Sequence, residues 1–191
     1  MVKSIMNTLS LQATPLAGLT IVHTTPVVDT RGRFERLFCE HELGSVRPHL
    51  HFTQINLSTT LRSGAMRGLH FQRPPFAEAK LIRCLSGRIF DVAVDLRIGS
   101  PTWLHWHAIE LDAESARQIF IPEGFAHGFQ ALSENAQLLY MHTARWNRES
   151  EGTLRHDDPM LDITWPLPAT EISTRDSSAA WIDERFVGIE A

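Results

Sequence analysis

The sequence predicts an all-β fold in which short strands form a β-sandwich or barrel. Between residues 20 and 145, short runs rich in Val, Ile, Thr, Phe and Trp alternate with turns that contain Gly, Pro, Asn or Ser. No stretch keeps the 3.6-residue hydrophobic period of a helix for more than about two turns. Many short strands at this spacing are typical of sandwiches and barrels.

The clearest predicted strand runs from Arg88 to Arg97. Apolar residues at its even positions alternate with Asp91 and Asp95, as expected for a strand with one apolar and one more polar face. The preceding strand, residues 81–85, is joined to it through Ser86-Gly87, which predicts a two-residue hairpin. Further strands are expected at residues 51–58, 103–111, 117–122 and 137–146, and short peripheral helices at residues 40–43 and 178–185.

Composition restricts the class of protein. The chain has 191 residues, of which 43% are hydrophobic and 21% charged, and neither a repeat nor a linker-like segment divides it, so one domain over residues 1–191 is expected, with an arm-like start of about 13 residues. The net charge of −4 lacks the basic footprint of a nucleic-acid-binding protein. No apolar run fits a signal peptide or a membrane span, so we expect a cytoplasmic protein with no membrane partner. Two cysteines, Cys39 and Cys84, make no disulfide scaffold, although one bridge between them is left open.

Histidines are numerous, and two pairs suggest metal binding at first sight. His49/His51 and His105/His107 each place two imidazoles on one strand face. A metal site also needs a carboxylate and a third ligand that converge on the pair. No acid follows the first pair until Glu78, so we favour strand histidines over ligands and expect no metal.

The segment MRGLHFQ, residues 66–72, combines Arg67 with His70. A guanidinium beside an imidazole suits an anion bound next to a general base, although a strand histidine is more often structural. On an ideal strand the two side chains point to opposite faces. Gly68 must therefore bend the chain if both are to serve one pocket.

The segment QLLYMHTARW, residues 137–146, places Tyr140, His142, Ala144 and Trp146 on one strand face. Six residues span roughly 20 Å along a strand, about the length of an extended sugar nucleotide. Tyr140 is the only tyrosine, and its phenol is either a core group or a proton donor.

Two further segments carry polar groups whose role the sequence alone leaves open. In PEGFAHGF, residues 122–129, two glycines allow a backbone to approach a ligand and orient His127 toward it, or simply form a tight corner. Asp176 lies 106 residues after His70, and an aspartate in such a loop is ordinarily a cap or turn residue. No sequence rule pairs these two residues.

Taken in order, these segments resemble the dTDP-4-dehydrorhamnose 3,5-epimerase family. The resemblance covers about residues 14–185 and implies a cupin-type jelly roll, a homodimer, a nucleotide-sugar substrate and no cofactor. It implies an isomerase that inverts C3 and C5 of a dTDP-linked 4-keto-6-deoxy sugar through an enolate. The matching stretches are DTRGRF (29–34), QINLS (54–58), RGLHFQ (67–72), AKLIRCLSGRIFDVAVDLRIGSPT (79–102), PEGFAHGF (122–129), DDPMLDITWP (157–166) and STRD (173–176).

The resemblance also implies a role for individual residues. His70 corresponds to the catalytic base, Asp176 to the acid that orients it, and Tyr140 to the proton donor. A 4-keto group acidifies the hydrogens on C3 and C5, so a base on one face and an acid on the other can invert either centre. The implied substrate-binding residues are Arg31 and Arg67 at the diphosphate, Lys80 and His127 near the sugar, Gln54 and Asn56 on the nucleotide side, and also Phe34 and Trp146.

Two positions depart from the family's pattern. Arg36 stands where the pattern has an acid, and Trp146 where a second tyrosine is common. Both belong to the nucleotide side, so inversion of only C3 or C5, or a GDP- or CDP-linked sugar, stays an alternative. A sugar-nucleotide 3,4-ketoisomerase is a further alternative, and an inactive binding protein or a metal oxygenase of the same fold is the last.

Overall fold

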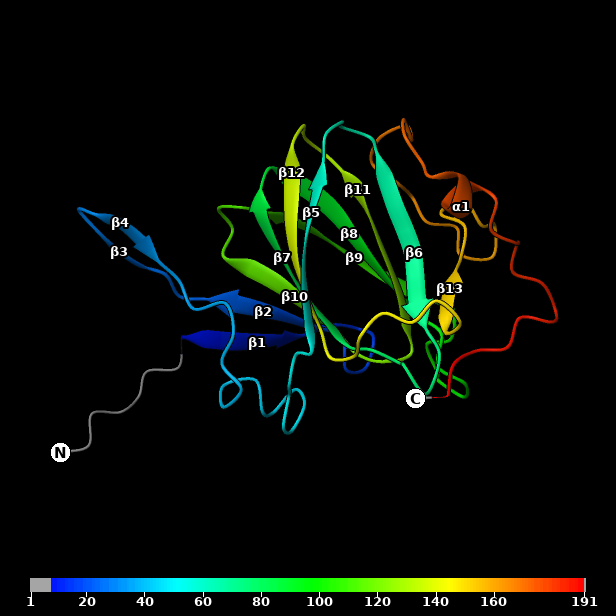
Figure 1. Ribbon diagram of the computed structural model, residues 1–191, viewed down its shortest axis with the longest axis horizontal. Coiled ribbons are helices and arrows are strands. Elements are labelled where there is room, and N and C mark those ends of the chain that lie inside the picture. The colour runs from blue at the N-terminus through cyan, green and yellow to red at the C-terminus, as the bar shows by residue number, and fades with distance from the viewer. Residues whose placement is uncertain (1–7, 191) are drawn as a thin grey trace.

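The computed structural model of the chain describes residues 8–190 and is built almost entirely of strands (Figure 1). This confirms the predicted all-β class. The elements are β1 (Leu9–Ala13), β2 (Thr20–Thr24), β3 (Val27–Asp29), β4 (Gly32–Phe34), β5 (Gln54–Thr60), β6 (Met66–Gln72), β7 (Lys80–Ser86), β8 (Arg88–Asp95), β9 (Trp106–Asp112), β10 (Arg117–Ile121), β11 (Phe125–Ala131), β12 (Ala136–His142), β13 (Glu151–Thr153) and α1 (Thr174–Ser177).

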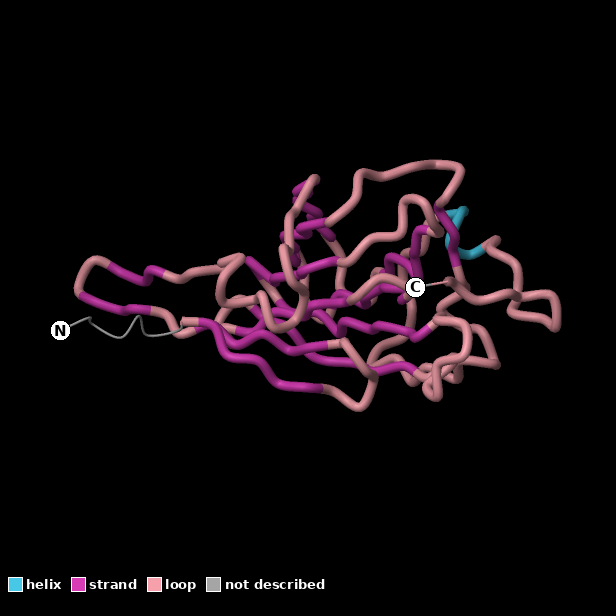
Figure 2. The backbone as a smooth tube through the Cα atoms, turned by 90° about the horizontal axis from the view of Figure 1, so that it is seen from below, coloured by secondary structure: helices cyan, strands magenta, loops and turns pink. Residues whose placement is uncertain are grey.

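Two antiparallel sheets form the sandwich. The 6-stranded sheet has the order β1-β2-β10-β7-β12-β5, and the 5-stranded sheet has the order β13-β6-β11-β8-β9. Strands that are neighbours in a sheet are mostly distant in sequence, as expected for a jelly roll. A separate hairpin of β3 and β4 projects from the sandwich, as Figures 1 and 2 both show.

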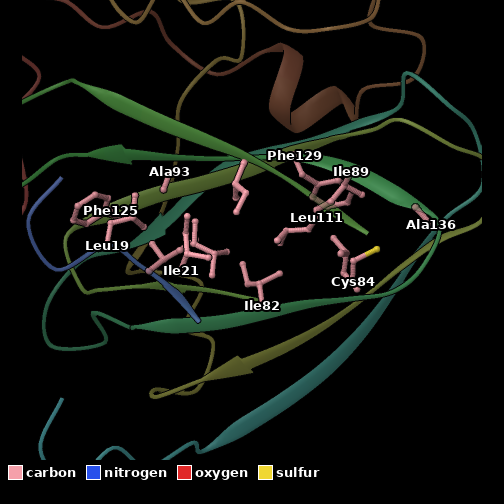
Figure 3. Close-up of a cluster of buried hydrophobic side chains, with 14 of the residues drawn as sticks. Leu19, Ile21, Ile82, Cys84, Ile89, Ala93, Leu111, Phe125, Phe129 and Ala136 are labelled. Carbon is pink, nitrogen blue, oxygen red and sulfur yellow. The ribbon is translucent and has the colours of Figure 1, made fainter. Parts of the chain in front are cut away.

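Three apolar clusters hold these layers together. The cluster between the sheets contains Ile82, Ile89, Phe125 and Phe129, all at most 3% exposed (Figure 3). A second cluster covers the outer face of the 5-stranded sheet with residues from the C-terminal segment, such as Ile189. The third joins the 6-stranded sheet to residues 38–52. Burial of this apolar surface is the main stabilising contribution to the fold.

Four local expectations need correction. β7 and β8 are consecutive but lie in different sheets, so the predicted hairpin at Ser86-Gly87 is wrong. Gly87 has a φ of +73° and turns the chain from one sheet to the other, where a side chain would approach Ser133 to 2.4 Å. Both faces of β8 are therefore buried, and neither is the polar face that the alternation suggests.

The helices and the arm also differ from expectation. Residues 40–43 form turns, residues 178–185 contain no helix, and α1 lies earlier at residues 174–177. Leu9–Ala13 pairs with β2 as the sheet-edge strand β1, so this part of the expected arm belongs to the sandwich, and residues 1–7 lie outside the described residues. Both thiols are free, which excludes a Cys39–Cys84 bridge in this structure. Over the described residues, no helix is long and apolar enough to cross a membrane.

Candidate active site

One cavity of about 720 Å³ has walls from both sheets and from the segment around α1. Residues of β5, β7 and β12 form one wall, and residues of β6 and β11 form the other. A volume of this size accommodates a medium-sized organic ligand. Of the predicted site residues, the cavity brings together His70, Tyr140, Asp176, Gln54, Asn56, Arg67, Lys80, His127 and Trp146.

The centre of the cavity contains an imidazole–carboxylate pair. His70 Nε2 lies 2.7 Å from Asp176 Oδ1, and the Gly68 amide donates to Asp176 Oδ2 at 3.3 Å. Burial by itself raises the pKa of Asp176, but the hydrogen bond and charge of His70 outweigh it and lower that pKa to about 2. The carboxylate is therefore ionised, and it holds one ring nitrogen so that the other can accept a proton.

α1 is the element that brings Asp176 to His70. Ser173 caps this short helix, and its side chain accepts a hydrogen bond from the Asp176 amide at 3.1 Å. The cap fixes the backbone of Asp176, so that its side chain is directed at β6 rather than at solvent. Asp176 is 3% exposed, which is unusual for an aspartate in a turn.

Gly68 explains how Arg67 and His70 reach the same cavity. Its φ is +114°, a conformation that favours glycine, and the pairing of β6 with β11 loses register opposite it. A Cβ at this position would lie 2.5 Å from Gly128 Cα and 2.7 Å from the His127 carbonyl oxygen. The strand bends here as the sequence required, and both side chains line the cavity.

Tyr140 lines the same cavity as His70 and comes from the opposite sheet. It is partly buried and packs between two imidazole rings: His127 contacts it edge-on with centroids 5.8 Å apart, and His142 stacks on it at 5.9 Å. Burial and the charge of Asp91 raise the pKa of Tyr140 well above its usual value. The phenol is therefore protonated at neutral pH and can act as a proton donor.

Asp91 and His127 form a second imidazole–carboxylate pair deeper in the wall. His127 Nε2 lies 2.9 Å from Asp91 Oδ2, and both residues are buried. Burial lowers the pKa of His127, although Asp91 counteracts part of this effect. This imidazole is neutral at neutral pH, and Asp91 is its buried partner.

Lys80 is a buried cation in the same cavity. Its Nζ donates to the His70 carbonyl oxygen at 3.2 Å and lies 3.3 Å from Glu78 Oε1. Lys80 is 5% exposed, and these two contacts fix its ammonium group beside the strand that carries His70. A fixed donor at this position can stabilise negative charge that develops on a bound ketone.

The residues that line the cavity but were not predicted as site residues include Glu78, His142, Glu151 and Arg175. Arg175 contacts His70 Nε2 and pairs with Glu151 at 2.8 Å. The sequence held a signal for Glu78 and His142, because Glu78 lies two residues before Lys80 and His142 shares the strand face of Tyr140.

Arg31 and Phe34 lie outside this cavity. Both are on the projecting β3–β4 hairpin, where Arg31 pairs with Asp29 and Phe34 is 74% exposed. The structure therefore does not bring these two residues to the His70 cavity of the same chain. The described residues also contain no group of three or more His, Cys, Asp or Glu side chains arranged to hold a metal ion.

Fold and site together define an acid–base isomerase built on a jelly-roll sandwich. A histidine with an ionised carboxylate partner and a protonated tyrosine share one cavity that is large enough for a sugar nucleotide. The family model described as dTDP-4-dehydrorhamnose 3,5-epimerase matches residues 13–184. The chain belongs to the dTDP-4-dehydrorhamnose 3,5-epimerase family.

Similar proteins agree with this assignment. A dTDP-4-dehydrorhamnose 3,5-epimerase of Sinorhizobium fredii is 39% identical over 168 residues, covering 87% of this chain and 86% of the relative. The crystal structure of the enzyme of that name from Elizabethkingia anophelis has a TM-score of 0.87 and 39% identity, covering 94% of this chain and 99% of that chain. The Legionella pneumophila structure in complex with dTDP-4-keto-L-rhamnose has a TM-score of 0.84 and 37% identity, covering 90% and 91%.

Proposed function

We propose that the protein inverts C3 and C5 of a dTDP-linked 4-keto-6-deoxy hexose, with His70 as the base and Tyr140 as the acid. The observation that carries this proposal is the placement of the His70–Asp176 pair and Tyr140 in one cavity, on walls from different sheets. Inversion needs a proton acceptor on one face of the sugar ring and a donor on the other. The ligand in the Legionella relative supports the choice of substrate.

The chemistry follows from the ketone at C4. His70 accepts the proton from C3 or C5, the electrons of the broken C–H bond form a C=C bond, and the carbonyl electrons move to O4. The resulting enolate is reprotonated on its opposite face by the Tyr140 hydroxyl. We assign stabilisation of the charge on O4 to Lys80, whose ammonium group is fixed beside the strand of His70. Only protons move, so the proposed reaction consumes no oxidant or reductant.

The cation distribution of the cavity suits the diphosphate. Arg67 and Arg175 both line it, and guanidinium groups bind phosphate oxygens through two parallel hydrogen bonds. At the other end, Gln54 Oε1 accepts from the Trp146 amide at 3.1 Å, and Asn56 lies on the same strand as Gln54. We assign this end to the nucleoside.

The projecting hairpin supports a homodimer. Arg31 is 88% exposed at its side chain, and Val27, Val28 and Phe34 are 62%, 71% and 74% exposed, which is costly for a solvated hairpin. A second copy of the chain would cover these apolar side chains and receive Arg31 at its diphosphate site. We propose this exchange between two copies in the cytoplasm, where the free thiols Cys39 and Cys84 are stable.

Incubation with dTDP-4-keto-6-deoxyglucose in D₂O tests the reaction. Deuterium at both C3 and C5, with L-configured product, supports double inversion. Deuterium and inversion at one centre favour a single-centre epimerase, and movement of the carbonyl favours a ketoisomerase. Absence of exchange with dTDP-, GDP- and CDP-linked substrates would refute the proposed activity.

Mixing two inactive variants tests the dimer. In a mixed dimer of Arg31→Ala and His70→Ala, exchange of hairpins creates one cavity with both native side chains. Activity therefore returns on mixing and unfolding–refolding the two variants together. If the hairpin served its own chain, or if the protein were monomeric, no native cavity would form and the mixture would stay inactive.

A further inference from the structure

A third imidazole–carboxylate pair borders the cavity and has no part in the reaction as described so far. His142 Nδ1 lies 2.9 Å from Glu78 Oε2, and the two side chains are only 12% and 9% exposed. Glu78 Oε1 in turn lies 3.3 Å from Lys80 Nζ. The pair connects β12 with the segment that leads into β7, and both members line the cavity.

His142 lies against the proposed proton donor. Its ring is nearly parallel to that of Tyr140, with an interplanar angle of 11°. The other imidazole at Tyr140, that of His127, is enclosed in the wall, and burial lowers its pKa. Of the two rings that contact Tyr140, His142 is the one with access to water in the cavity, and so the one that can exchange protons with solvent.

Double inversion makes a demand that a single base and a single acid do not meet. After the first inversion, His70 carries an extra proton and Tyr140 has lost one. The second inversion again needs an unprotonated His70 and a protonated Tyr140. Tyr140 must therefore regain a proton while the sugar stays bound. Burial and the nearby charge of Asp91 make the tyrosinate unfavourable, which favours rapid reprotonation if a donor is close.

We propose that the Glu78–His142 pair returns a proton to Tyr140 after each inversion. In this step the imidazolium of His142 gives its proton to the Tyr140 oxygen, directly or through one water, and becomes neutral imidazole. His142 then takes up a proton from cavity water while His70 releases to that water the proton it took from carbon, so charge and protons balance over the cycle. This inference rests on the proposed role of Tyr140, and His142 acts on the sugar only through that residue.

The surroundings of His142 suit an imidazole that must keep its orientation while it loses and regains a proton. Burial raises the pKa of Glu78, but the hydrogen bond from His142 and the charge of Lys80 outweigh it and keep that pKa below its usual value. The ionised carboxylate fixes the proton on Nδ1, and Nε2 lies 3.4 Å from the Asn56 amide nitrogen on β5. The Glu78 carboxylate lies between the Lys80 ammonium group and His142, so its negative charge offsets the repulsion between Lys80 and a protonated His142.

Other charged groups face the same space from the opposite sheet. His70 and its partner Asp176 come from β6 and α1, and Asp91 lies behind His127. These groups are held in pairs as His142 is with Glu78, but among His70, His127 and His142 only the His142 ring stacks on Tyr140 in parallel. The base, His70, thus belongs to one imidazole–carboxylate pair, and the acid, Tyr140, lies against another.

His142→Phe is the decisive variant, since a phenyl ring keeps the stacking on Tyr140 and removes the exchangeable proton. We expect steady-state turnover to fall by about 10-fold or more, because proton transfer by a positioned group contributes typically about 10²–10⁴-fold. The first C–H cleavage, followed as deuterium exchange in a single turnover, stays near the wild-type rate. Singly inverted sugar accumulates, and added imidazole buffer restores turnover in proportion to its acid form.

Controls separate the relay from a structural effect. His23, a strand histidine that bonds Gln12 outside the cavity, provides the matched variant His23→Phe, which turns over normally. If His142→Phe does not fold, His142→Gln serves with the same readouts. Wild-type turnover in the folded variant, or a loss that buffer acids do not restore, overturns the relay. Absence of exchange in wild type and His23→Phe alike would instead refute the proposed epimerase activity.

Discussion

Asp176→Asn tests how strongly the carboxylate acts on His70. The pKa of Asp176 is lowered from 3.8 to about 2, and one pKa unit corresponds to about 1.4 kcal/mol, so the fold favours the ionised carboxylate by about 2 kcal/mol. His70 provides the largest part of that preference through its 2.7 Å contact. Asp176→Asn removes the negative charge from this contact and leaves the rest of the side chain nearly unchanged in shape.

One kinetic measurement follows for this variant. Asparagine cannot carry the negative charge that Asp176 places 2.7 Å from His70 Nε2, so the positive charge that His70 gains with the abstracted proton loses its partner. kcat for deuterium exchange falls by about 10²–10⁴-fold, since a weakened and unoriented base abstracts protons poorly. A wild-type kcat for deuterium exchange, followed by NMR, would refute the reasoning.

Stability provides an independent readout. The folded pKa of Asp176 is depressed, so its stabilising contribution is fully present above about pH 4 and is lost as the pH falls toward 2. In urea unfolding, Asp176→Asn is therefore less stable than wild type by up to about 2 kcal/mol at pH 7. The difference narrows as the pH falls through this window. A gap that stays constant down to pH 3 would contradict the assignment of the ionised carboxylate.

Three further changes have defined outcomes. Gly68→Ala, at φ +114° with its Cβ 2.5 Å from Gly128 Cα, should destabilise the protein by about 2 kcal/mol or more and lower kcat, measured by thermal unfolding and activity. Tyr140→Phe should keep His70-dependent exchange into solvent but lose inversion, seen by NMR of recovered sugar; retained inversion would remove Tyr140 as the acid. Asp95→Asn should cost about 3 kcal/mol in urea unfolding, because Asp95 is fully buried and accepts hydrogen bonds from Arg97, Ser100 and Thr102.

Local patterns predicted the strands well and their partners poorly. Alternation and turn residues indicated β8, β9, β10 and β12, because these properties depend on neighbours in sequence. The hairpin at Gly87 was wrong because the same Ser-Gly turn also fits a corner between sheets, and only the packing of Ser133 and Ala136 decides which forms. The polar face assigned to β8 was wrong for the same reason, since Asp91 is buried against a histidine from β11.

The candidate site was predictable to a similar extent. The segment with Gly68 indicated a bend, and the structure confirms it. Asp176 could be connected to His70 only through the family resemblance, because the contact depends on how α1 docks on β6. Alternation along the strand placed His142 on the same face as Tyr140. Its partner Glu78 lies in the segment before β7, far away in sequence, so only the folded chain brings the two together.

The carboxylate that serves His70 comes from a segment that packs on the outside of the 5-stranded sheet and does not contribute a strand to it. The segment is bonded to the sheet, for example by the Met66 amide, which donates to the Glu171 carbonyl oxygen at 2.8 Å, but the pairing of the strands with one another does not include it. We therefore expect activity to be lost on warming before the β-sheet circular dichroism signal, because the position of Asp176 depends on this segment and the pairing of the strands does not.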